Sequence, residues 1–157
     1  MSCDVAVAAF LMFASNPQGS PAPMLIPAAA PASAVASEPL FKDIVGRADK
    51  LKAQVGDYRK ALTGGDAPLV LPAFDEFRAE IGQLSVLDEQ GHVLLKQRGT
   101  DGDLTCILHG ISQDLGLKLA AVVAAKTGHD QDQALRDMAY LLNDNIEVIT
   151  APPAPPA

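Results

Sequence analysis

The chain has 157 residues, of which 48% are hydrophobic but only 4% aromatic, with five Phe, two Tyr and no Trp. A core built from Leu, Ile, Val and Ala favours closely packed helices over a large β-sandwich. The formal net charge of −7 argues against nucleic-acid binding as the main activity, because proteins that bind phosphate backbones usually carry a clustered positive field. The composition therefore predicts one mainly α-helical domain that binds no nucleic acid.

Both ends of the chain have compositions that are unsuited to a folded core. Residues 1–36 are rich in Ala and Pro, and residues 151–157 contain only these two residue types. Because Pro lacks a backbone donor and fixes φ, both segments are expected to be flexible or extended. The apolar run at residues 5–14 is about half as long as a membrane-spanning helix, so it predicts no membrane span. We expect it to dock on a partner or on the protein's own core through Phe10 and Leu11.

Residues 37–63 carry the strongest periodic pattern in the chain. Ser37 is suited to a helix N-cap and Pro39 to the first turn, while Gly64 and Gly65 follow as a stop. Apolar residues recur at alternating spacings of three and four: Phe41, Ile44, Ala48, Leu51, Val55, Tyr58 and Leu62. This heptad seam predicts a helix that pairs with another helix in an oligomer or packs on its own domain. All seam residues except Ala48 are candidate interaction residues.

Residues 64–150 are predicted to form a helical domain. Apolar residues at helical spacing predict helices over about 72–83, 103–126 and 130–150, and each begins near a capping residue or a proline. Together with residues 37–63, these segments predict a small helical bundle that contains one long heptad-patterned helix.

The segment 84–97 can be interpreted as a helix that continues through Gly91 or as two strands. Asp88 and Gly91 occupy the first and fourth positions of a type I turn, and Gly91 is free to adopt positive φ. This spacing favours a β-hairpin at 84–97. A two-stranded hairpin is marginal by itself, so we expect it to lie against the helices.

One pair of residues has the spacing of metal ligands or of a catalytic dyad. Cys106 and His109 lie one helical turn apart, but no further ligand accompanies them at helical spacing. His92 and His129 would have to come from elsewhere in the fold. Cys106 is expected to be a small buried apolar residue, and no metal, cofactor or catalytic residue is predicted. The two cysteines, Cys3 and Cys106, indicate no disulfide framework, so a cytoplasmic location is the expectation.

The features that remain are contact features, namely the heptad seam, the helical body and the apolar N-terminal run. They favour a structural or adaptor protein of a bacterial-type assembly that acts through helix-mediated protein contacts and oligomerisation. A subunit or substrate of a secretion or phage assembly machine is the alternative, with residues 1–36 as an export or assembly segment and an exported or virion-associated location. An enzyme centred on Cys106 and His109 is the least favoured hypothesis.

Overall fold

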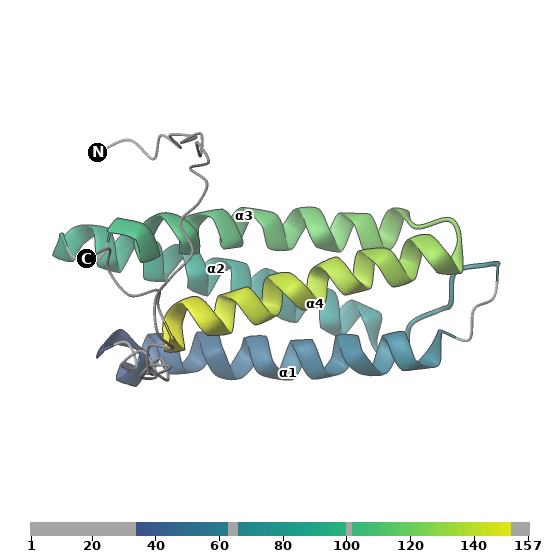
Figure 1. The fold of residues 1–157 in the computed structure, drawn as a ribbon, viewed down its shortest axis with the longest axis horizontal. Coiled ribbons are helices and arrows are strands. Elements are labelled where there is room, and N and C mark those ends of the chain that lie inside the picture. The colour runs from purple at the N-terminus through teal and green to yellow at the C-terminus, as the bar shows by residue number, and fades with distance from the viewer. Residues whose placement is uncertain (1–33, 63–65, 100–101, 152–157) are drawn as a thin grey trace, which may run out of the picture.

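The chain folds into a bundle of four helices. The computed structural model describes residues 34–62, 66–99 and 102–151. A short 3-10 helix η1 (Ala34–Ser37) precedes α1 (Pro39–Ala61), α2 (Phe74–Arg98), α3 (Gly102–Ala124) and α4 (Gly128–Thr150). Each long helix packs on two neighbours in the cyclic order α1, α2, α3 and α4 (Figure 1). The α1–α2 and α3–α4 connections therefore lie at the same end of the bundle.

The heptad seam of α1 forms one wall of the core. Its buried side chains belong to one hydrophobic cluster with side chains of α2, α3 and α4, whereas Leu62 is only partly buried against this cluster. At the end of the seam, the ring of Tyr58 lies edge-on to Phe77 at a centroid distance of 5.4 Å. The Tyr58 hydroxyl donates a hydrogen bond to the Pro72 carbonyl at 2.8 Å and accepts one from Gln54 Nε2 at 2.7 Å. The seam thus packs against its own chain, one of the two arrangements that its spacing predicts.

The β-hairpin prediction for residues 84–97 was wrong, because α2 continues through this segment without interruption. The buried positions of α2 continue at spacings of three and four: Phe77, Ile81, Leu84, Asp88, Gly91 and Leu95. Asp88 and Gly91 are therefore core positions of a helix and not turn residues. Among the described residues there is no strand.

Gly91 permits a close approach between helices. A Cβ atom at this position would lie 3.2 Å from Leu108 Cδ1 and 3.3 Å from Phe41 Cε1, which is closer than most Cβ contacts. The presence of glycine at position 91 is therefore explained by the close packing of α1 and α3 against the α2 backbone, and not by a turn.

The helix ends agree with the predicted ones to within a few residues, except that α2 is one long helix. The N-cap of α4 is Thr127, whose Oγ1 accepts a hydrogen bond from the Asp130 N–H at 3.0 Å. At the start of α2, Ala73 adopts a φ of +51°, a conformation that side-chain-bearing residues rarely adopt.

Among the described helices, α3 alone is long and apolar enough to meet the length and composition criteria for a membrane span. Its most apolar stretch has a mean hydropathy of 1.3, and 28% of that stretch is buried inside the bundle. A single helix of this kind is weak evidence for a membrane span, because core helices of soluble bundles meet the same criteria. In this fold, α3 packs between α2 and α4.

Candidate functional site

The predicted interaction residues fall into two groups. Phe41, Ile44, Leu51, Val55 and Tyr58 lie in the core of the bundle, and Leu62 lies at its edge. Phe10 and Leu11 lie outside the described residues. In this conformation, the five buried seam residues therefore present no surface to a second protein.

An exposed apolar surface lies at the end of the bundle that carries the α1–α2 loop. Leu69, Val70 and Val123 are 39%, 92% and 58% exposed. Together with Phe74 and Val122 they line a shallow hollow of about 400 Å³. We call these five residues the apolar end. Single exposed apolar residues are ordinary on protein surfaces, but a contiguous group often marks a contact site.

The loop at the apolar end is fixed by a buried glutamine of α4. Gln131 Oε1 accepts a hydrogen bond from the Leu69 N–H at 2.8 Å, and Gln131 Nε2 donates to the Leu69 carbonyl at 3.0 Å. Because both backbone groups of Leu69 meet one side-chain amide, they point to the same side, as in an extended strand. The Gly128 N–H also donates to the Asp66 carbonyl at 3.3 Å. The exposed valine at position 70 is therefore held on an ordered support.

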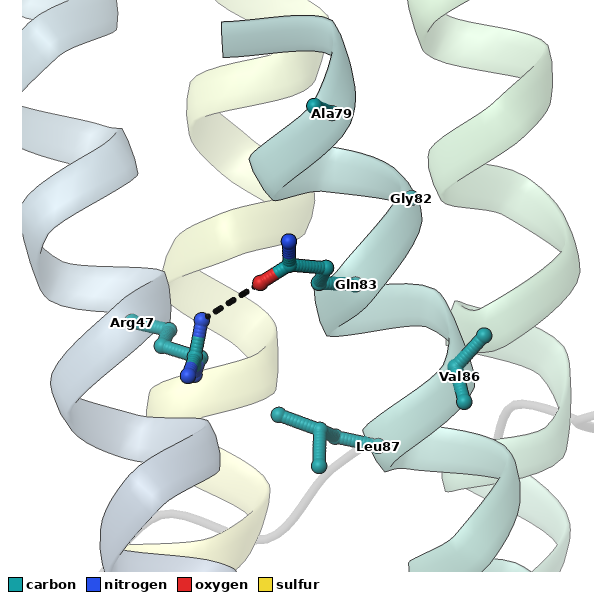
Figure 2. A pocket seen from close by; sticks show the side chains of 6 residues that line it. All are labelled: Arg47, Ala79, Gly82, Gln83, Val86 and Leu87. Carbon is teal, nitrogen blue, oxygen red and sulfur yellow. Dashed lines mark hydrogen bonds between the residues drawn. The ribbon is translucent and has the colours of Figure 1, made fainter. Parts of the chain in front are cut away.

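A second hollow, of about 410 Å³, lies along the surface between α1 and α2. Figure 2 shows the residues that line it, among them Gly82, Val86 and Leu87; Arg47 of α1 is hydrogen-bonded to Gln83 of α2 at 3.0 Å. The Arg47 guanidinium also contacts Asp43 and Glu80. This hollow is therefore crossed by a charged network. The hollow at the apolar end is also lined by one charged side chain, Arg78, which pairs with Asp75 at 3.4 Å.

Three potential metal ligands gather between α2 and α3. One ligand atom from each of Glu89, His92 and His109 can be chosen so that all lie within 4.8 Å of one another, and the three side chains are partly buried. The Nδ1 atom of His109 lies 2.8 Å from Glu89 Oε2, and the two histidine rings lie 4.8 Å apart. The hydrogen bond from His109 lowers the pKa of Glu89 from its usual value, so this carboxyl is an anion at neutral pH.

Sequence reasoning singled out His109 but did not pair it with Glu89 and His92. Glu89 and His92 are three residues apart on one helix, and the antiparallel packing of α2 on α3 brings them to His109. The three-residue spacing of Glu89 and His92 places both side chains on one face only if residues 84–97 are helical. Under that assumption the sequence could have indicated a pair of ligands here. The wrong hairpin prediction therefore concealed this cluster.

A buried polar pair lies in the core, beside this cluster in sequence but on another face of α2. Asn145 Nδ2 of α4 donates a hydrogen bond to Asp88 Oδ2 at 2.9 Å, and both side chains are fully buried. The remaining oxygens, Oδ1 of Asp88 and Oδ1 of Asn145, have no hydrogen-bond partner among the described residues. Burial raises the pKa of Asp88 to about 8.

The catalytic dyad of Cys106 and His109 receives no support from the geometry. Cys106, expected to be a small buried apolar residue, is only partly buried, and it is disulfide-bonded, so it carries no free thiol. His109 is instead hydrogen-bonded to Glu89 and Gln113. His129 is exposed at the start of α4 and does not belong to the cluster. No protein-family model, curated protein or solved structure matches the chain.

Proposed function

We propose that the protein is an adaptor that binds an apolar segment of a different protein through its apolar end. The observation that carries the proposal is the exposure of Val70, which is 92% exposed beside Leu69 and Val123 on an ordered loop. Fully burying an exposed valine or leucine side chain contributes about 1.5–3 kcal/mol, so Val70 and Val123, with a smaller contribution from Leu69, can supply the core of an interface.

Preorganisation supports the same proposal. The two hydrogen bonds of Gln131 fix the Leu69 backbone before any partner binds, so less conformational entropy is lost on association. The backbone N–H and C=O of Val70 make no hydrogen bond among the described residues. In an extended segment these groups point away from those of Leu69, and they can pair with the backbone of an extended peptide. An extended apolar segment is therefore the form of partner that fits this surface.

The apolar end also replaces the heptad seam as the proposed contact surface. Contacts through Leu51 or Val55 would require the bundle to open, because these side chains are buried in the core. Contacts through Val70 leave every core side chain in place. An adaptor that uses this surface therefore keeps its fold on binding.

The proposal is tested by placing a photo-crosslinking amino acid at position 70 of the full chain, expressed in its native cells. We expect a discrete crosslinked product with one other protein, identified by mass spectrometry. The substitution Val123→Asp should abolish that product, because it places a charge in the same apolar surface. The matched control carries the crosslinker at position 86, an exposed valine of α2 beside the other hollow.

Three results would overturn the proposal. A crosslink at position 86 that is stronger than that at position 70 would move the contact to the hollow between α1 and α2. A product that contains two copies of this chain would indicate self-association. A crosslink within one chain to residues 5–14 would show that the protein covers its own apolar end.

A further inference from the structure

We propose that Glu89, His92 and His109 form a zinc site that supplies two imidazole nitrogens and one carboxylate oxygen to the ion. This set is one of the common ligand combinations of Zn²⁺, and three protein ligands leave a fourth position for water or for an external ligand. The chosen ligand atoms lie within 4.8 Å of one another. In a tetrahedral site with bonds of about 2.0–2.1 Å they would draw in to roughly 3.3 Å.

The first ligand, His92, has its tautomer set by a backbone contact. Its Nδ1 lies 2.7 Å from the Thr105 carbonyl oxygen, which can only accept a hydrogen bond. Nδ1 therefore carries the proton, and in the neutral ring the lone pair is on Nε2. A backbone carbonyl in this position is a frequent second partner of metal-bound histidines, because it fixes the ring orientation and the tautomer.

The other two ligands are held together before any ion binds. The Nδ1–H of His109 donates to Glu89 Oε2 at 2.8 Å. The Ser112 hydroxyl lies 3.1 Å from the same oxygen and 2.7 Å from the His109 carbonyl, and its one proton is shared between these two acceptors. An ion between these atoms takes the place of the proton on His109 Nδ1. That proton moves to Nε2, where Gln113 lies 3.0 Å away and can accept with its amide oxygen after rotation.

The surroundings of the cluster favour a cation with an open coordination position. The His109 and Glu89 side chains are 43% and 44% exposed, so an ion can reach them and the side chains can rotate towards it. The chain carries a net charge of −7, which favours cation binding. Imidazole and carboxylate ligands suit Zn²⁺ better than Ca²⁺ or Mg²⁺, both of which prefer all-oxygen sites.

The test is a calorimetric titration of the full chain with ZnCl₂ at neutral pH after removal of metals with a chelator. We expect saturable binding of one zinc per chain. His92→Gln and His109→Gln should each weaken it by more than roughly tenfold, because each removes a direct ligand. Glu89→Gln should also weaken it, since the amide keeps the shape of the side chain but loses the negative charge.

The control is His129→Gln, which removes an exposed histidine outside the cluster and should leave the zinc affinity unchanged. Far-UV circular dichroism establishes that each variant retains its helices. The absence of saturable binding would overturn the proposal. It would also be overturned if folded His92→Gln and His109→Gln bound zinc as tightly as the parent, or if His129→Gln caused the largest loss.

Discussion

Asp88 and Asn145 join diagonally opposite helices through a buried hydrogen bond of 2.9 Å. Each of them keeps one oxygen without a partner among the described residues. If Asp88 Oδ1 is protonated, it can donate a second hydrogen bond within this pair, to Asn145 Oδ1, which otherwise has no donor. The geometry and the raised pKa therefore both favour a neutral carboxylic acid in the core.

Stability is predicted to fall as the pH rises from about 4 to about 8. Across this window the folded chain keeps the Asp88 proton and the unfolded chain loses it. Each pH unit can therefore lower the free energy of unfolding by up to about 1.4 kcal/mol. Above the folded pKa the dependence levels off. Urea unfolding at a series of pH values, in the presence of a chelator, measures the slope.

The matched variant for this measurement is Asp88→Asn. An amide at position 88 can exchange two hydrogen bonds with Asn145 at every pH, so the difference in slope between parent and variant isolates Asp88. The lowered pKa values of Glu38, Glu89 and Asp132 act in the opposite direction and only as the pH falls below their ordinary range. An identical slope in parent and variant would contradict a neutral Asp88.

The two glycines of α2 at positions 82 and 91 should respond differently to the same substitution. Gly82→Ala meets no atom within 4 Å and should raise the free energy of unfolding by about 1 kcal/mol through helix propensity. Gly91→Ala should lose that gain, because its Cβ would press on Leu108 and Phe41. Thermal unfolding of both variants checks the difference. Equal gains would show that the core near Gly91 accommodates a methyl group without cost.

Removal of the Gln131 amide should loosen the loop at the apolar end. Gln131→Leu removes both hydrogen bonds to the Leu69 backbone, and each contributes about 0.5–1.5 kcal/mol. We expect faster proteolysis between residues 66 and 72 and a lower melting temperature. Gln133→Leu is the control, because its amide is exposed and bonds to Asp137 rather than to the loop. Similar cleavage in both variants would contradict the anchoring role of Gln131.

A core position and a surface position should respond differently to the same aspartate substitution. Leu51→Asp buries a carboxylate in the core and should prevent folding of the bundle, as seen by loss of helical circular dichroism. Val70→Asp should change the free energy of unfolding by less than about 0.5 kcal/mol, because the side chain is almost fully exposed. A folded Leu51→Asp variant would show that the seam is not essential to the core.

The sequence by itself determined the helical class, the seam of α1 and most helix ends, because all three depend on local periodicity and capping. Tertiary structure decided the rest. Asp88 and Gly91 have turn propensity, but in the bundle one forms a buried pair with Asn145 and the other provides space for Phe41. Helix packing likewise brought Glu89 and His92 to His109, and it placed Val70 on the surface beside Val123. Contacts between residues far apart in the chain outweigh local propensity, so the sequence pattern of α2 could not reveal them.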